Sequence, residues 1–252
     1  MLNFVYVSDL HIDNHRFDFN VLMKEEYADS VLLIVGDTFT YTYQSTKHLG
    51  HIVEKLSKYF RYILIVLGNH DYWGCTLLEA LYGAREAIKD IGNAKVLSYD
   101  EVFVIDDIAI FGDTLWSDIP PFAETAIQGL NDYQHILSDV TAKLTVYETN
   151  QWNALAKESL CKFLVDYKEY KKLVVTHFPP LFVYTGYEPS VYDSYFGNSG
   201  IEKHFHESAP LYYIFGHTHT KIDIVIGDTH LLTNPRGYVG ENGDYILESF
   251  SV

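Results

Sequence analysis

The stretch Tyr62-Ile63-Leu64-Ile65-Val66-Leu67-Gly68-Asn69-His70-Asp71 joins an apolar run directly to a polar cluster. The apolar run has the length and composition of a buried strand, and the cluster carries an amide, an imidazole and a carboxylate. An Asn-rich turn alone would not explain a His and an Asp placed directly after such a strand. The stretch therefore predicts a strand of an α/β sheet that ends at a functional site.

Four other polar clusters follow apolar runs in the same way. The runs are FVYVS, VLLIV, KLVVT and LYYIF, and the clusters are Asp9-Leu10-His11, Gly36-Asp37, His177 and Gly216-His217-Thr218-His219. Singly, an Asp-x-His, a Gly-Asp turn or one His is weak evidence, whereas two His residues two apart can chelate from one loop. Because strand ends meet at one edge of a sheet, we expect all five clusters to converge. Asp, His and Asn without Cys suit Mn, Fe, Zn or Mg-type ions.

The rest of the pattern predicts an α/β sandwich of two sheets with helices outside, in a single domain that spans residues 1–252. Strands and helices alternate in the first half, which implies parallel strands. A capping box, Thr76 with Glu79, opens one predicted helix. Further elements are predicted as helices at 46–60, 76–90 and 151–170, helical pieces at 123–129, a hairpin of 102–105 with 108–111, and closing antiparallel strands at 222–226, 229–233 and 245–250.

The formal net charge of −16 argues against an extended nucleic-acid groove, which normally shows clustered Lys and Arg. Bound divalent cations would reverse the sign locally, so a small phosphate ester could still be attracted. The pattern predicts no signal peptide and no membrane span, and Cys75 and Cys161 are expected to be buried thiols. We therefore expect a cytoplasmic protein of a bacterium, or of a phage within one.

The five clusters in this order resemble the calcineurin-like metallophosphoesterase superfamily, in which Asp-x-His, Gly-Asp, Gly-Asn-His-Asp, His and Gly-His-x-His occur in sequence. The resemblance covers essentially the whole chain and implies a four-layer α/β/β/α sandwich with two mixed sheets. It also implies a dinuclear centre of divalent ions (Mn, Fe, Zn, Ni or Mg, with Mn favoured). The implied ligands are Asp9, His11, Asp37 and His219 for the first metal, and Asp37, Asn69, His177 and His217 for the second.

Two further roles follow from that resemblance. His70 would donate a proton to the leaving group rather than bind metal, and Asp71 would orient its ring. Protein Ser/Thr phosphatases carry an acidic-Arg-Gly continuation after Gly-Asp and a Glu after Gly-Asn-His, which Thr38-Phe39 and Asp71 do not match. The stretches at 114–118, 131–133, 176–180 and 234–242 resemble instead a bacterial and phage metallophosphoesterase subfamily.

Residues outside the five clusters leave alternatives open. Arg236 is either a bidentate phosphate clamp or a tie that holds its turn to the fold through carbonyls. Asp132 and Tyr133 either line the pocket or cap a helix, and Trp116 is expected in a wall or the core. Aromatic residues after His177 could cover the site and stack on a base, or pack elsewhere: Tyr184, Tyr187, Tyr192, Tyr195 and Phe196.

These features predict a metal-dependent hydrolase of phosphate esters. A small nucleotide phosphodiester such as a cyclic nucleotide is the favoured substrate, because the charge disfavours a nucleic-acid strand. A phosphomonoesterase or a nuclease of the same superfamily is the alternative. The alternative from another class is a non-catalytic scaffold of this fold, which the complete set of candidate ligands disfavours. No membrane partner is expected, and the oligomeric state is left open.

Overall fold

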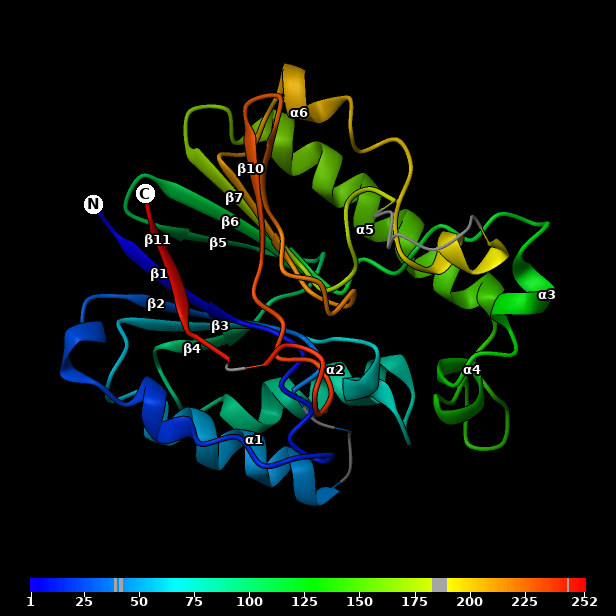
Figure 1. Cartoon of the computed structure of the whole chain (residues 1–252), viewed down its shortest axis with the longest axis horizontal. Helices are drawn as coiled ribbons and strands as arrows, with labels where there is room; N and C mark the ends of the chain where they lie inside the picture. The colour runs from blue at the N-terminus through cyan, green and yellow to red at the C-terminus, as the bar shows by residue number, and fades with distance from the viewer. Residues whose placement is uncertain (39, 41–42, 183–189, 244) are drawn as a thin grey trace.

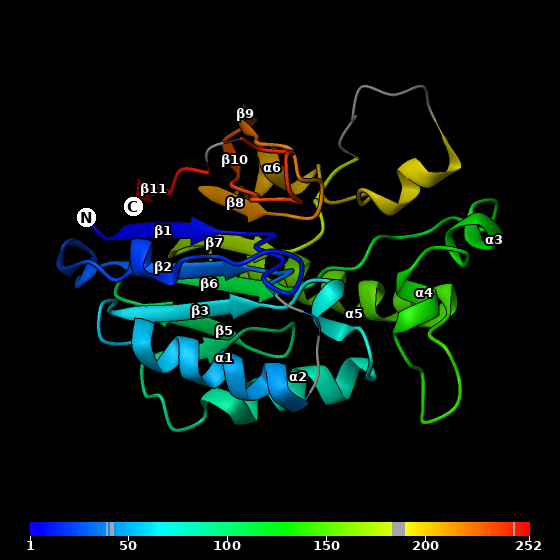
Figure 2. The same cartoon turned by 60° about the horizontal axis from the view of Figure 1, so that its bottom comes forward.

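The strands of the computed structural model, which describes residues 1–38, 40, 43–182, 190–243 and 245–252, form two sheets that face each other. Helices cover the outer side of each sheet, so the chain has four layers (Figure 1). A second view shows α1 and α2 against the first sheet, with α3 and α4 beyond the ends of the strands (Figure 2). None of the described helices is both long and apolar enough to cross a membrane.

The first sheet contains the strands that carry the first three polar clusters. Its order is β11-β1-β2-β3-β4, with β1 to β4 parallel and β11 antiparallel to β1. The strands are β1 (Asn3–Val7), β2 (Val31–Val35), β3 (Tyr62–Val66), β4 (Ala94–Val96) and β11 (Glu248–Ser251).

The second sheet carries the remaining two clusters, after β7 and β8. Its order is β5-β6-β7-β8-β10-β9, with the four central strands parallel and both edge strands antiparallel to their neighbours. The strands are β5 (Val102–Ile105), β6 (Ile108–Asp113), β7 (Lys171–Thr176), β8 (Tyr212–Phe215), β9 (Asp223–Ile226) and β10 (Thr229–Thr233).

Helices α1 and α2 pack against the first sheet through their apolar faces, and α5 packs against the second. Thr76 caps α2 with the predicted reciprocal hydrogen bonds to Glu79. The helices are α1 (Tyr43–Leu56), α2 (Leu77–Ile88), α3 (Glu124–Ile127), α4 (Asp132–His135), α5 (Val146–Asp166) and α6 (His204–Glu207), with short 3-10 turns η1 (Phe19–Leu22), η2 (Glu25–Tyr27), η3 (His70–Tyr72) and η4 (Val191–Tyr195).

Buried apolar side chains form three layers of core, which explains why the strands read as continuous apolar runs rather than alternating ones. The residues between the sheets include Leu33 of β2 and Val175 of β7. Residues on the opposite faces pack against helices, as Ile34 does beside α1 and α2, and Val174 beside α5. Both sheets are therefore rigid supports for the loops at their strand ends.

Several predicted elements need correction. Helix α5 begins earlier than predicted, because a second capping box, Thr145 with Glu148, starts it at Val146. Leu155 of α5 lies on the solvent side of the helix, with 47% relative exposure. Strand β10 is parallel to β8, and β11 crosses to the first sheet, so the predicted closing strands are antiparallel only in the β9–β10 and β11–β1 pairs. Cys75 is buried, Cys161 is half-buried, and both are free thiols.

Candidate metal centre

The five polar clusters lie at the carboxyl ends of β1, β2, β3, β7 and β8, as predicted. The first two are held together by the backbone hydrogen bonds Asp9 N–H to Gly36 O and His11 N–H to Asp37 O, both at 3.0 Å, and His70 N–H of the third donates to the Asp37 carboxylate at 2.9 Å. On the second sheet, Gly216 N–H donates to His177 O at 3.0 Å. Residues far apart in the chain are thereby brought to one edge, where the two sheets meet.

The backbone is strained at these clusters. The described non-glycine residues with positive φ include Asp9 (51°), Asp37 (51°) and three of the His residues: His11 (41°), His217 (66°) and His219 (51°). Such conformations cost on the order of 1–3 kcal/mol each and persist only where the surrounding structure imposes them. Their concentration at one edge marks this edge as a functional site.

Asp9, His11 and His219 form a first group around one oxygen of Asp37. The Nε2 atoms of His11 and His219 lie 3.1 Å apart, and His219 Nε2 lies 3.5 Å from Asp9 Oδ1. His11 Nε2 is 3.8 Å from Asp37 Oδ2. These atoms point at a common volume rather than at separate partners.

Asn69, His177 and His217 form a second group around the other oxygen of Asp37. Asn69 Oδ1 lies 2.9 Å from His177 Nε2 and 3.1 Å from His217 Nδ1. His177 Nε2 is 3.4 Å from Asp37 Oδ1. Asp37 therefore offers one carboxylate oxygen to each group, which is the arrangement that a bridging ligand requires.

The spacing of these atoms fits bound divalent cations. Metal bonds of about 2.1 Å that meet at roughly 90–110° place neighbouring ligand atoms roughly 3.0–3.4 Å apart. The His177 Nδ1–H donates to Val35 O at 3.0 Å, and Asn69 Nδ2 donates to Asp132 at 3.0 Å. In neutral His177, the Nε2 lone pair thus faces a lone pair of Asn69, and a cation between the two atoms removes the repulsion. Asp9 Oδ2 and His217 Nε2 are also buried without a hydrogen-bond partner among the described residues.

The electrostatics of the group agree with a site for positive charge. Burial alone would raise the pKa of Asp37, but His177, His70 and His11 outweigh burial and hold that pKa well below its ordinary value. Burial would lower the pKa of His177, but Asp37 and Asp9 raise it to about 9. Burial and the neighbouring His177 lower the pKa of His217 well below its ordinary value. The two buried carboxylates, Asp9 and Asp37, thus favour positive charge beside them, which is the charge that a bound cation would supply.

Several hydrogen bonds fix the outward-facing atoms of the candidate ligands. The His219 Nδ1–H donates to Glu241 Oε2 at 2.7 Å, and the His177 Nδ1–H donates to the Val35 carbonyl. The Asn69 amide donates to Asp132 Oδ1, which also accepts the indole N–H of Trp73 at 2.7 Å. Partners of this kind set the tautomer of a ligating ring and the orientation of an amide.

Asp71 has a different role from the expected one. Its Oδ2 accepts the backbone N–H groups of Asp37 at 2.9 Å and Gly68 at 2.8 Å, and its Oδ1 accepts that of Thr38 at 3.0 Å. It therefore holds the loops after β2 and β3 together. A carboxylate that faces three convergent N–H groups satisfies donors that would otherwise be orphaned at the strand ends.

His70 is held by aromatic side chains instead. Its ring stacks on Trp73 with centroids 4.0 Å apart, and its Nε2 lies 3.3 Å from the Tyr238 hydroxyl. Its Nδ1 has no hydrogen-bond partner among the described residues. The His70 backbone N–H donates to Asp37 Oδ1 at 2.9 Å, so His70 sits beside both ligand groups while its side chain borders the pocket.

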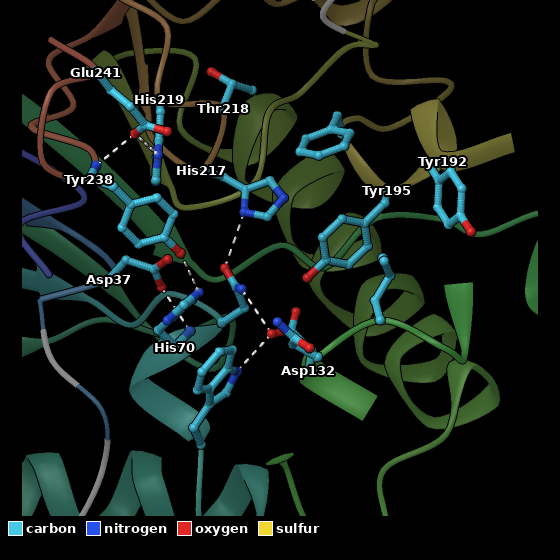
Figure 3. Close-up of a pocket in the computed structure, with 15 residues that line it drawn as sticks. Asp37, His70, Asp132, Tyr192, Tyr195, His217, Thr218, His219, Tyr238 and Glu241 are labelled. Atoms are coloured by element: carbon cyan, nitrogen blue, oxygen red, sulfur yellow. Dashed lines mark hydrogen bonds and ion pairs between the residues drawn. The ribbon is translucent and has the colours of Figure 1, made fainter. Parts of the chain in front are cut away.

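A pocket of about 540 Å³ opens over the two groups (Figure 3). Its described lining comprises Asp37, Asn69, His70, Trp73, Leu130, Asn131, Asp132, Tyr192, Tyr195, Phe196, His217, Thr218, His219, Tyr238 and Glu241. Of the predicted aromatic loop, Tyr192, Tyr195 and Phe196 thus border the site, with the Tyr195 ring 5.0 Å from that of His217. Tyr184 and Tyr187 lie outside the described residues.

The remaining candidates separate clearly. The Arg236 guanidinium donates to the carbonyls of Leu10 (3.0 Å), His15 (3.1 Å) and Arg16 (2.7 Å), which is the tie through carbonyls rather than the phosphate clamp. Asp132 lines the pocket and is the first residue of α4. Tyr133 is buried, with its hydroxyl 3.0 Å from the Thr149 hydroxyl, and is no part of the described lining.

Three residues at the site had no assigned role on sequence grounds: Trp73, Tyr238 and Glu241. Trp73 lies three positions after His70, and the other two belong to the 234–242 stretch that the subfamily resemblance includes. For Tyr238 and Glu241 the only signal in the sequence is their place in that stretch, and for Trp73 it is the short distance from His70 along the chain. Of the three, only Glu241 has a side chain that commonly binds metals. Trp116 is buried in the core, as expected.

Comparisons with known proteins agree with this geometry. The family model described as calcineurin-like phosphoesterase matches residues 2–221. An uncharacterized protein of Acanthamoeba polyphaga mimivirus, L509, is 26% identical over 270 residues, which cover 95% of this chain and 92% of that protein.

Solved structures with a similar fold include the phosphopantetheinyl hydrolase PptH of Mycobacterium tuberculosis, with a TM-score of 0.75, 15% identity, and coverage of 99% of this chain and 95% of that one. A candidate 5′-nucleotidase from Staphylococcus aureus has a TM-score of 0.52 and 16% identity, and this alignment covers 94% of this chain and 48% of that one. At such identities the likeness concerns the fold, and it confirms the four-layer architecture. With the family model matching most of its length, the chain belongs to the calcineurin-like phosphoesterase family.

Proposed function

We propose that this protein is a dinuclear metallophosphoesterase that hydrolyses a small nucleotide phosphodiester such as a cyclic nucleotide. The observation that carries the proposal is the position of Asp37, whose two oxygens each face one group of candidate ligands, with His70 alongside. Asp9, His11 and His219 would hold one metal, and Asn69, His177 and His217 the other, with Asp37 shared. The imidazole and oxygen ligands suit Mn²⁺, which we favour.

The chain's own groups account for binding and protonation. Two divalent cations, when bound, supply an activated water and neutralise the phosphoryl oxygens. Protonated His70 gives its proton to the departing oxygen of the ester and thereby completes cleavage of the P–O bond. Trp73 and Tyr238 hold the ring of His70 for this transfer, and Tyr192, Tyr195 and Phe196 border the same pocket.

The charge of the pocket lining favours a substrate whose leaving group carries no second phosphate. None of the described lining residues is Lys or Arg, whereas Asp132 and Glu241 add negative charge. The residues outside the description (39, 41–42, 183–189 and 244) include no Lys or Arg in sequence either. A polyphosphate or a nucleic-acid strand would bring charge that no side chain here neutralises. Aromatic side chains fit a flat base, which favours the small nucleotide diester, with a phosphomonoester as the alternative.

The rival proposal is a non-catalytic scaffold that has kept only the fold. The presence of both ligand groups together with His70 disfavours this hypothesis, because a scaffold has no need for strained ligands around buried carboxylates.

The absence of a membrane-spanning helix in the described chain and the two free thiols are compatible with the cytoplasmic location that we propose.

The test is a substrate panel for the Mn²⁺-loaded protein. It contains bis-p-nitrophenyl phosphate, p-nitrophenyl phosphate, linear and cyclic nucleotides, single-stranded DNA and RNA, with products followed by mass spectrometry. A phosphopantetheinyl ester is added because the hydrolase of similar fold is named for that group. We expect hydrolysis of the cyclic nucleotide that stops on addition of EDTA.

Two results would count against the proposal. Strong degradation of DNA or RNA beside inert cyclic nucleotides would reject the substrate class. If the metal-loaded protein cleaves neither the nitrophenyl esters nor any member of the panel, and partner binding is unaffected by Asp37→Asn, the scaffold reading replaces the enzyme.

A further inference from the structure

The loop of residues 236–242 touches both strand-end segments that supply the first ligand group. Arg236 N–H and Gly237 N–H donate to the carbonyls of Ser8 and Asp9, each at 3.0 Å. The Asn242 amide donates to His219 O at 3.0 Å. The loop therefore joins the segment of β1 to the segment of β8 from outside the metal centre.

Glu241 is the side chain of this loop that reaches a candidate ligand. Its Oε2 accepts His219 Nδ1–H and the Tyr238 backbone N–H, both at 2.7 Å. Gly237, with φ +70°, allows this close approach, since a Cβ there would lie 2.6 Å from the same oxygen. The loop is shaped around the carboxylate, which is what a built support for a ligating imidazole requires.

Tyr238 extends the same loop to the proton donor. Its hydroxyl lies 3.3 Å from His70 Nε2, while its ring lies 4.6 Å from the ring of His11 and 4.8 Å from that of His219 (Figure 3). One short loop thus contacts a candidate metal ligand and the candidate proton donor.

We propose that the 236–242 loop is the positioning element of the first metal site, in which Glu241 orients His219 and Tyr238 orients His70. The inference rests on the proposed function for the role of His70, but the part that concerns Glu241 depends only on metal binding. Because outer partners of ligating His residues typically change metal affinity by about 10–100-fold, the loop sets how tightly the first metal is held. The second group depends on Val35 and Asp132 and lies outside its reach.

Mn²⁺ binding by calorimetry tests the role of Glu241. Glu241→Ala should weaken one of two Mn²⁺ sites by about 10–100-fold and leave the other unchanged. Glu241→Gln, which keeps an oxygen acceptor and serves as the variant that preserves the loop, should weaken the same site less. The matched control is Asp223→Asn, because Asp223 pairs with His230 at 2.6 Å on the surface, away from the centre, and its loss should change neither site.

Leaving-group dependence tests the role of Tyr238. Tyr238→Phe keeps the ring and removes the hydroxyl, so kcat should fall by roughly 2–10-fold on an ester with a poor leaving group, with KM and Mn²⁺ content unchanged. Activated nitrophenyl esters need little protonation and should be affected less. Tyr82→Phe, at an exposed position of α2 outside the described pocket lining, is the control and should change neither kcat nor its dependence on the leaving group.

The outcomes separate this inference from the proposed function. If the wild type is active and Glu241→Ala keeps full Mn²⁺ affinity at both sites, the inference is wrong and the proposed function stands. An inactive wild type in which Glu241→Ala still weakens one Mn²⁺ site overturns the function and supports the positioning role of Glu241. Equal losses of kcat on poor and activated esters in Tyr238→Phe overturn the role of Tyr238.

Discussion

The tripeptide Gly-Asp-Thr occurs three times in the chain: Gly227-Asp228-Thr229 connects β9 to β10 with an exposed Asp, and the other two copies follow or end strands of different sheets. Gly36-Asp37-Thr38 follows β2, and Gly112-Asp113-Thr114 ends β6 and continues beyond it. Both Asp side chains are buried, at 2% and 5% relative exposure. The same three residues nevertheless do different work, which a sequence pattern alone cannot distinguish.

The two carboxylates differ in what surrounds them. Asp113 accepts hydrogen bonds from Leu115 N–H at 2.7 Å, Tyr99 N–H at 2.9 Å and the Ser98 hydroxyl at 3.2 Å, and burial raises its pKa to about 6. Asp37 lies among ring nitrogens, and despite its burial those rings hold its pKa well below the ordinary value.

The glycines differ in the same way. Gly36 has φ +83°, and a Cβ on it would lie 2.2 Å from His177 Nδ1. Gly112 lies within β6, where a Cβ would meet the Leu97 side chain at 2.5 Å. One Gly-Asp is packed against imidazoles and the other against an aliphatic side chain. A buried carboxylate among N–H donors stabilises a loop, whereas a buried carboxylate among imidazoles is prepared for a cation.

The largest expected difference between the two regions concerns metal binding. Asp37→Asn removes the shared negative charge while Asn tolerates the positive φ of this position. We expect loss of both metals and of activity by on the order of 10³-fold or more. Elemental analysis after dialysis and steady-state kinetics measure both effects.

Asp113→Asn is the control for that variant, since it changes a buried Asp of the same tripeptide. It should retain both metals and most of its activity. Equal depletion of metal in both variants would mean that burial, rather than the ring of imidazoles, decides the function of these carboxylates.

The next effect concerns His70, whose backbone N–H binds Asp37 and whose ring lies 4.7 Å from that of His11 and stacks on Trp73. His70→Ala should keep both metals but lose about 10²–10⁴-fold in turnover on esters with poor leaving groups. Activated nitrophenyl esters should lose less, because their leaving group needs little protonation. Loss of both metals in this variant would overturn the assignment of His70 as a proton donor.

Gly36→Ala and Gly112→Ala give a smaller, matched test. Both should destabilise the fold by about 1–3 kcal/mol through overpacking. Only Gly36→Ala displaces His177, so it alone should also weaken Mn²⁺ binding, by about 10–100-fold. Thermal unfolding and calorimetry separate the two effects, and equal Mn²⁺ affinities in the two variants would contradict the structural distinction.

Much of the fold could be predicted because its signals are local. The apolar runs predicted β1, β2, β3, β7 and β8, and the Thr76 capping box predicted the start of α2. The start of α5 was missed although Thr145 and Glu148 carry the same signal, because the apolar spacing begins later in that helix. The pairing of β11 with β1 is a contact between the two ends of the chain, which local spacing does not encode.

In the candidate site, too, some features were predictable from the sequence and others were not. Which clusters meet was predictable, since strand ends in a sheet share an edge. The partners of those clusters were not, because they depend on side-chain directions across loops. Asp71 thus accepts three backbone N–H groups, and the Arg236 guanidinium binds three carbonyls. Glu241 reaches His219 only because the loop folds back over it.

The last test distinguishes the two carboxylates by the pH dependence of stability. Asp113 has a folded-state pKa of about 6 against an ordinary value of 3.8. Between these values the folded protein holds a proton that the unfolded chain releases, so the free energy of unfolding must fall as pH rises from 4 to 6. A shift of this size corresponds to roughly 3 kcal/mol.

Asp37 changes stability with pH in the opposite direction, because its pKa is lowered. Ionised Asp37 stabilises the fold fully above its ordinary pKa, and this stabilisation is lost only at more acid pH. Urea unfolding of wild type and Asp113→Asn across pH 4–7, with EDTA present so that metal binding does not contribute, isolates the Asp113 effect as a difference. Stability of the variant relative to wild type should rise with pH through this window. Parallel curves would show that Asp113 is ionised in the folded protein throughout, and that its N–H donors stabilise the charge as fully as imidazoles do at Asp37.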